Sequence, residues 1–318
     1  MLDVHRLRLL RELDRRGTLA AVARALSYSP SAISQQLSQL EAETGVVLLE
    51  PAGRGVRLTP QARVLVGHTE AILQRLEEAE AELRASLAEV SGTLRVASFQ
   101  SVLLALVPSV LTSLAGRHPG LRVEITHEEA GPAFAGLLAH DFDLVLGEEY
   151  PGVARPPVIG ARTQLLANDE LFLVFPDHGP YAVDRPAEAP VRLADLAAVP
   201  WVLDPADTPP GQWARNACRE AGFEPDVRYS GSDLLLQIHL AETGHAAAVL
   251  PGLLLAAVPP PAARVQPVPG RPHRRLTTGV RAGAARHPAI RAFRAALREA
   301  IRESRQPEKD LENNLPDK

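Results

Sequence analysis

Apolar residues recur at helical spacing through the N-terminal part of the chain. The pattern predicts a first helix with the apolar stripe Val4, Leu7, Leu10 and Leu13. It predicts a second helix with the stripe Leu19, Val22, Ala23 and Leu26. Gly17 suits the end of the first helix, and Thr18 suits the N-cap of the second. The two helices are therefore expected to follow each other closely.

A third helix is predicted from residue 29 to residue 43. Ser29 is a favourable N-cap, and Pro30 takes the first helical position, where its missing N–H costs nothing. One face is apolar, and the opposite face carries Ser31, Ser34, Gln35 and Ser38. Because the first two turns of this polar face hold no acid, it can approach a polyanion and hydrogen-bond base edges in a major groove. Taken alone, the pattern slightly favours an ordinary solvated amphipathic helix, but with the preceding helix it forms a helix-turn-helix.

Two short extended segments follow the third helix. The apolar run 46–49 and the alternating run 56–58 flank a turn with Pro51, Gly53, Arg54 and Gly55. We interpret this as a two-stranded wing with Arg54 at its tip, a candidate for a phosphate or minor-groove contact. The alternative is an ordinary exposed hairpin arginine.

A long helix is predicted from Pro60, capped by Thr59, to about Glu89. Its apolar residues follow a heptad, with Leu65, Ile72 and Ala79 at one seam position and Leu76, Leu83 and Val90 at the other. A single helix cannot bury such a seam on itself, so the pattern favours a dimer. The alternative is that the helix packs against its own domain.

After Ser91 and Gly92 the pattern changes to alternating strands and helices, which predicts mostly parallel sheets. We expect strands at 94–98, 122–127, 143–147, 171–175, 199–203, 227–229, 246–250 and 276–281. We expect helices at 101–115, 134–140, 214–221, 234–243 and 287–303. The proline-rich segment 251–272 is interpreted as a linker or crossover. Chain crossings near residues 160 and 270 would then separate two lobes, with a small-ligand crevice at the carboxyl ends of the strands.

The fold class predicted is α/β with an N-terminal all-α winged helix-turn-helix. The winged helix-turn-helix occupies 1–59 and the dimerising helix 60–90. The two-lobed domain occupies 91–304, with lobe I at 91–162 and 270–304 and lobe II at 163–269. Residues 305–318 are charged and poor in apolar side chains, so we expect a disordered tail.

Composition narrows the class of protein. A formal net charge of −4 argues against a wholly basic nucleic-acid binder, yet residues 1–60 hold eight arginines against six acids. One cysteine excludes an intrachain disulfide and fits a reducing compartment. With no signal-peptide pattern and no run of apolar residues long enough for a membrane span, a cytoplasmic protein without a membrane partner is expected.

These segments together resemble the LysR-type transcriptional regulator family. The resemblance is carried by the runs at 17–23, 29–37 and 54–60, with Leu40, Glu41 and Gly45. Two departures stand out. Leu49, Glu50 and Pro51 replace the family's usual aromatic, polar and arginine residues, which removes one backbone contact. Ala62 replaces a glycine, which favours helix.

The resemblance implies a DNA-binding regulator with a dimerising linker helix and an effector domain like the periplasmic binding proteins. It further implies promoter DNA as a partner, a homodimer or homotetramer, and RNA polymerase as a further candidate partner. The expected DNA contacts come from the second and third helices and the wing: Thr18, Ser29, Pro30, Ser31, Ser34, Gln35, Arg54 and Arg57.

By position in the family, Ser98 to Ser101 and Leu203–Asp204 match the effector-contacting ends of strands. Ser101 lies at a predicted helix start beside Ser98 and Gln100, where free N–H groups attract an anion such as an effector carboxylate. Glu148 and Asp204 are candidates to hold a cationic group such as an amine. The alternative is that both are solvated loop acids, and Ser230 and Ser232 can equally be helix caps.

An enzyme is the competing class, and the chain lacks its motifs. No Gly-x-Ser-x-Gly elbow is present, and with lysines only at 309 and 318 a Gly-Lys phosphate loop is excluded. His127 and Glu128 lack a second histidine at metalloprotease spacing, so we expect no catalytic residue, metal site or cofactor. An architectural DNA-binding protein is a second competitor, but DNA bending needs no two-lobed α/β segment.

Overall fold

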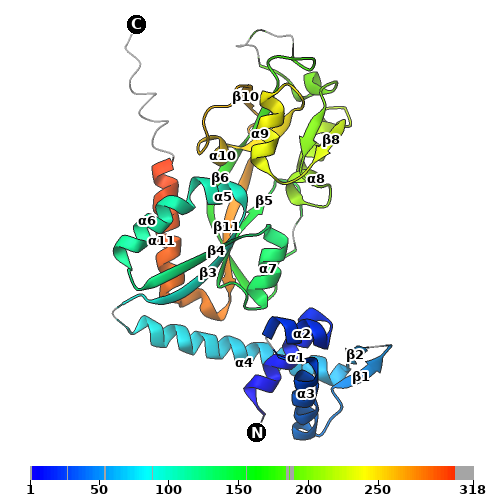
Figure 1. The fold of residues 1–318 in the computed structure, drawn as a ribbon, viewed down its shortest axis with the longest axis vertical. Coiled ribbons are helices and arrows are strands. Elements are labelled where there is room, and N and C mark those ends of the chain that lie inside the picture. The colour runs from blue at the N-terminus through cyan, green and yellow to red at the C-terminus, as the bar shows by residue number, and fades with distance from the viewer. Residues whose placement is uncertain are drawn as a thin grey trace.

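A computed structural model describes residues 2–26, 28–53, 55–87, 89–154, 156–183, 186 and 190–304 (Figure 1). Three helices form the N-terminal head: α1 (Val4–Arg16), α2 (Leu19–Leu26) and α3 (Pro30–Thr44). The predicted caps are confirmed, since Gly17 ends α1 at φ 76° and Ser29 accepts a hydrogen bond from the N–H of Ala32. The helices meet around Leu10, Val22 and Leu37, all fully buried.

The wing consists of β1 (Leu49–Ala52) and β2 (Gly55–Leu58), paired antiparallel. Glu41, near the end of α3, holds the start of the wing in place. One of its carboxylate oxygens accepts hydrogen bonds from the N–H groups of Leu48 at 2.8 Å and Leu49 at 3.0 Å. Pro51 lies inside β1 opposite Val56, where an edge strand tolerates proline. Arg54 lies outside the described residues.

Helix α4 (Pro60–Ala85) begins at the predicted cap Thr59 but ends four residues before the expected Glu89. One of its faces packs against α1 through Ala62, Val66 and Thr69. Further along, the same face lies on the 3-10 helix η2 (Gly283–Arg286), where a Cβ on Gly283 would be 2.5 Å from the Gln74 carbonyl oxygen. The helix therefore packs against its own chain along one face, as the alternative reading expected.

The middle of the heptad seam forms a second, neighbouring face of α4 that is open to solvent, whereas Leu65 packs on the head and Val90 lies beyond the helix against lobe I. Ile72 is 39%, Leu76 44% and Leu83 70% exposed. The intrachain packing of α4 is confirmed, and the dimer stays a prediction that the uncovered apolar stripe allows.

One sheet runs through both lobes in the order β10-β6-β11-β5-β3-β4, and β9 also pairs with β6. Its strands are β3 (Gly92–Ser98), β4 (Leu121–His127), β5 (Leu144–Glu149), β6 (Ala161–Phe175), β9 (Ala248–Pro251), β10 (Arg264–Pro267) and β11 (His273–Arg281). Strands β3, β4 and β5 are parallel, whereas β11 is antiparallel to β5 and β6. The fifteen-residue β6 passes without interruption from lobe I to lobe II, so the expected boundary after residue 162 falls inside a strand.

The helices and short strands surround this sheet (Figure 1). Lobe I carries α5 (Gln100–Ala105), α6 (Val107–Arg117), α7 (Ala130–Leu138) and α11 (Pro288–Ser304). Lobe II carries η1 (Leu193–Leu196), β7 (Trp201–Leu203), α8 (Pro209–Glu220), β8 (Val227–Ser230), α9 (Leu234–Glu242) and α10 (Gly252–Leu255). Each lobe has its own core, built around Phe293 in lobe I and Trp201 in lobe II.

Four predictions about this domain were wrong. The main sheet is mixed rather than mostly parallel, because β6 pairs antiparallel with β9, β10 and β11. The expected helix 101–115 is divided into α5 and α6, because Pro108 cannot donate a hydrogen bond to the preceding turn. The proline-rich segment is not only a linker, since it contains α10 and the edge strand β10. The predicted strand 171–175 begins ten residues earlier, at Ala161. The expected tail at 305–318 lies outside the described residues.

Candidate functional site

Helix α3 lies at the end of the head farthest from lobe II (Figure 1). On its polar face Ser31, Ser34 and Gln35 are exposed, and the side chains of Ser34 and Gln35 have no hydrogen-bond partner among the described residues. The acids of α3 lie in its last turns and have partners: Glu41 binds the start of the wing and Glu43 pairs with Arg6. The first two turns of the face therefore present neutral donors and acceptors.

The other expected DNA-contacting residues have local structural roles. Ser29 accepts the N–H of Ala32 at 3.1 Å, and Thr18 accepts the N–H of Ala21 at 3.1 Å, so both are helix caps. Pro30 is the first residue of α3. In the wing, Arg57 is 65% exposed and its guanidinium lies 2.9 Å from Glu50. Such an exposed ion pair is worth at most about 1 kcal/mol, so a phosphate can displace Glu50.

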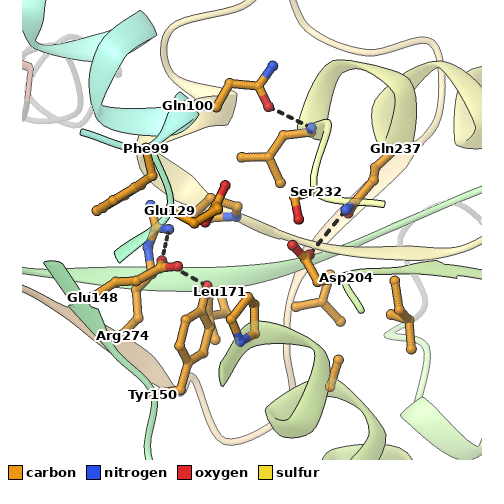
Figure 2. A pocket seen from close by; sticks show the side chains of 16 residues that line it. Phe99, Gln100, Glu129, Glu148, Tyr150, Leu171, Asp204, Ser232, Gln237 and Arg274 are labelled. Carbon is orange, nitrogen blue, oxygen red and sulfur yellow. Dashed lines mark hydrogen bonds and ion pairs between the residues drawn. The ribbon is translucent and has the colours of Figure 1, made fainter. Parts of the chain in front are cut away.

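A cavity lies between the two lobes of the sheet domain, at the carboxyl ends of β3, β5 and β7 (Figure 2). Its walls include Phe99, Gln100 and Glu148 from lobe I and Leu203 and Asp204 from lobe II. The volume is about 30 Å³, space for little more than a water molecule. The lobes are closed in this arrangement, because the Gln100 amide donates to Asp233 at 3.0 Å and accepts the N–H of Leu234 at 2.7 Å.

A buried arginine that the sequence analysis missed forms the floor of this cavity. Arg274 on β11 donates to Glu148 at 2.7 Å and to Asp169 at 2.8 and 2.9 Å. It also donates to the Ser101 hydroxyl at 2.7 Å. Burial would lower the pKa of the Arg274 guanidinium, but the Glu148 and Asp169 carboxylates keep it above its ordinary value. The positive charge of Arg274 is thus fully engaged by protein groups.

Of the five predicted effector residues, three line the cavity. Gln100, Glu148 and Asp204 do so, whereas Ser98 and Ser101 are fully buried and absent from its wall. The Ser101 hydroxyl accepts a hydrogen bond from Arg274 and is fully buried, so burial keeps it from reaching a carboxylate in the cavity. The cap of α9 is Asp233 rather than Ser230 or Ser232.

Two carboxylates at the cavity lack a cationic partner strong enough to stabilise their charge. Burial, followed by repulsion from Glu148 and Asp204, raises the pKa of Glu129 to about 7. Burial also raises the pKa of Asp204 to about 6, although Gln237 donates a hydrogen bond to it at 3.1 Å. Perturbed carboxylates in a cleft are typical of functional sites, because the fold holds them there at a cost in stability.

Replacing Asp204 with asparagine is expected to stabilise the ligand-free protein at pH 8. The folded state holds the proton more tightly than the unfolded state, so the free energy of unfolding falls as pH rises from about 4 to above 6. Asp204→Asn removes this loss and keeps an acceptor for Gln237, so a gain of about 1–3 kcal/mol is expected at pH 8 and almost none at pH 4. Thermal unfolding at both pH values measures it.

The exposed Asp207, three residues along in the same loop, provides the control. Asp207→Asn should leave the Tm unchanged at both pH values. Equal effects of the two substitutions, or a gain at Asp204 that is as large at pH 4 as at pH 8, would show that the Asp204 carboxylate carries no burial cost.

Other site types are not found in the described ranges. No group of three or more histidine, cysteine, aspartate or glutamate side chains is arranged to hold a metal ion there. No helix in those ranges has the length and apolar character needed to cross a membrane.

Comparison with known proteins covers both parts of the chain. The profile of the "Bacterial regulatory helix-turn-helix protein, lysR family" matches residues 4–63, and that of the "LysR substrate binding domain" matches residues 87–302. A curated relative, the probable hydrogen peroxide-inducible genes activator of Mycobacterium avium, is 28% identical over 289 residues and shares 89% of each chain.

Solved structures agree with this assignment. A full-length OxyR variant from Pseudomonas aeruginosa has the same fold, with a TM-score of 0.66 at 18% identity over 94% of this chain and 95% of that one. Full-length CbnR in complex with its target DNA gives a TM-score of 0.50 at 25% identity over 95% of this chain and 99% of that one. This chain belongs to the LysR family: it is a DNA-binding transcriptional regulator with an effector-binding domain, not an enzyme.

Proposed function

We propose that α3 enters the major groove of promoter DNA and that Ser34 and Gln35 contact base edges. Ser31, Ser29 and Thr18 would lie at or near phosphates, with Pro30 among them. Arg57 would leave Glu50 and bind the DNA backbone or the minor groove. From its position in the sequence alone, Arg54 is proposed to make a contact of the same kind. The observation that carries the proposal is the exposed, acid-free first half of α3, with two side chains whose hydrogen-bonding groups are unused.

Two heads are proposed to act together through α4. The exposed stripe with Ile72, Leu76 and Leu83 fits a partner's identical stripe, and a dimer presents two recognition helices to two half-sites. Assembly into tetramers, contact with RNA polymerase and a cytoplasmic location are further parts of the proposal. The first two rest on the resemblance to the family alone, and the location rests on the sequence composition.

The interlobe cavity is proposed as the effector site, and β11 as its link to the head. Arg274 lies in the cavity near one end of β11, and Arg281 at the other end pairs with Glu77 of α4. A change in lobe closure at Arg274 can therefore shift α4 and the spacing of the heads. An effector acts in this way only if it binds one lobe arrangement more tightly than the other.

Two substitutions in the head test the roles proposed for α3 and the wing. Gln35→Ala should cost about 1–3 kcal/mol on the preferred duplex and relax the preference at one base position. Arg57→Ala should weaken binding to all duplexes and lower the salt slope by roughly one. Quantitative DNA-binding titrations at several salt concentrations measure both, with the exposed Gln212→Ala in lobe II as control. An equal loss on every sequence for Gln35→Ala contradicts its role in base reading.

The peroxide induction in the name of the Mycobacterium avium relative does not suit the cysteine of this chain. Cys218 is the chain's one cysteine, and it is fully buried in lobe II. Burial, followed by repulsion from Glu224, raises the pKa of its thiol to about 12. Peroxide reacts with accessible thiolates, and this thiol is neither accessible nor ionised at neutral pH. We therefore infer an effector that binds without covalent chemistry.

A further inference from the structure

Carboxylates from both lobes face the interlobe cavity. Glu129 precedes α7 and Glu148 is the last residue but one of β5, both in lobe I, while Asp204 follows β7 in lobe II. Figure 2 shows Glu129 and Glu148 on one side of the cavity and Asp204 on the other. The substrate-binding domain to which this cavity belongs already points to a ligand. The side chains that line the cavity determine the chemical class of that ligand.

The charge at this cavity is not balanced by the protein. Arg274 is the cation on its described walls, and behind the wall it also binds Asp169, a fourth carboxylate. One guanidinium therefore faces four acids, and it lies on the Glu148 side. The His127 ring, which carries charge only when protonated, lies 4.0 Å from Glu129, and within the described ranges Asp204 has only hydrogen bonds from neutral groups.

An anion finds no free donor among the first N–H groups of α9, because Leu234 donates to Gln100 while Leu235 and Leu236 donate to Asp233. The Ser101 hydroxyl accepts from Arg274 and is fully buried, out of reach of a ligand in the cavity. An effector carboxylate entering the cavity would meet three carboxylates and displace existing hydrogen bonds.

We propose that the cavity binds a small organic cation, a protonated primary amine on a short apolar body. This rests on the proposed role of the cavity as the effector site. The ammonium group would donate hydrogen bonds to Glu129 and Asp204, while Phe99, Leu171 and Leu203 contact the carbon body. Three N–H donors suit two or three converging carboxylates, which a neutral alcohol cannot satisfy in the same way.

The cation would also favour lobe closure. Without it, the carboxylates of lobe I repel Asp204 of lobe II across the cavity, and this repulsion contributes to the raised pKa values of Glu129 and Asp204. With it, both sides are attracted to one positive charge. Since the cavity in this arrangement has a volume of only about 30 Å³, the lobes must part at the Gln100–Asp233 contact to admit the ligand, and they then close around it less far than they do here.

Size-matched probes on the full chain test the charge class. At pH 8 a panel of propylamine, benzylamine and putrescine is compared with butyrate, benzoate and benzyl alcohol by thermal shift and calorimetry. We expect at least one amine to raise the Tm and bind, and no anion to do so. A larger shift with butyrate or benzoate, or no shift with any amine at 10 mM, overturns the proposal.

Variants then locate the bound amine. Glu129→Gln and Asp204→Asn should each weaken amine binding by at least about tenfold, whereas Asp207→Asn should leave it unchanged. Ser232→Trp fills the cavity from its wall and should abolish binding in a protein that circular dichroism shows to be folded. Amine binding that survives Ser232→Trp overturns the proposed effector site itself. Anion binding that Ser232→Trp abolishes leaves the site in place and rejects only the cationic class.

Discussion

Arg274→Met is expected to lower the free energy of unfolding of the effector domain by about 3–5 kcal/mol. The substitution keeps much of the apolar volume of the side chain but leaves Glu148 and Asp169 without their cation. These two residues are only 6% and 8% exposed, so water cannot replace the lost partner. Thermal unfolding at pH 7, followed by circular dichroism, measures the loss.

A matched pair of variants separates the buried charge from other effects. Arg275, the next residue on β11, is 57% exposed and pairs with Glu149 at 3.2 Å, so Arg275→Met should cost less than about 1 kcal/mol. Adding Glu148→Gln and Asp169→Asn to Arg274→Met removes the unpaired charges and should recover most of the stability. A triple variant as unstable as Arg274→Met would show that packing, not charge, explains the loss.

Leu76→Glu combined with Leu83→Glu in α4 is expected to convert the proposed dimer into monomers and to reduce affinity for a two-half-site operator by about a hundredfold or more. Each chain should keep its fold, since these side chains are 44% and 70% exposed. A dimer would have to bury four carboxylates in an apolar seam, which costs far more than the seam gains. Affinity for a single half-site should not change. Analytical ultracentrifugation and titration of both duplexes measure these effects.

Ala71→Glu is the control for the seam. Ala71 is exposed on α4 but lies off both the heptad stripe and the face that packs on α1. It should leave the mass in solution and the operator affinity unchanged. If Leu76→Glu with Leu83→Glu leaves the protein a dimer, the proposed role of the seam is wrong.

Sequence patterns predicted the head well because its determinants are local. Caps such as Ser29 and Gly17 act within one turn, and the apolar stripe of α3 needs only helical spacing to be recognised. The extent of α4 was harder to predict, because its last turns depend on contact with η2, a segment about two hundred residues away in the chain. Whether an apolar stripe faces a partner or its own domain cannot be read from spacing alone.

The floor of the cavity was missed for a related reason. Arg274 stands in the run His273-Arg274-Arg275, which reads as a solvated loop after a proline. Only pairing with β5 and β6 shows that Arg274 points inward and Arg275 outward. Asp169 lies between Asn168 and Glu170, so the sequence gives no sign that it is buried. Its partner Arg274 is 105 positions away. In the sequence Glu129 stands next to Glu128, but adjacent acids are usually solvated and so do not by themselves predict a cavity.

Selection of bound duplexes from a random library, at fixed salt and with excess competitor DNA, tests the account most directly. Two heads joined through α4 predict enrichment of one sequence with inverted half-sites, spaced about one helical turn or a multiple of it apart. No enrichment over the starting library, or enrichment of an isolated half-site alone, would contradict it.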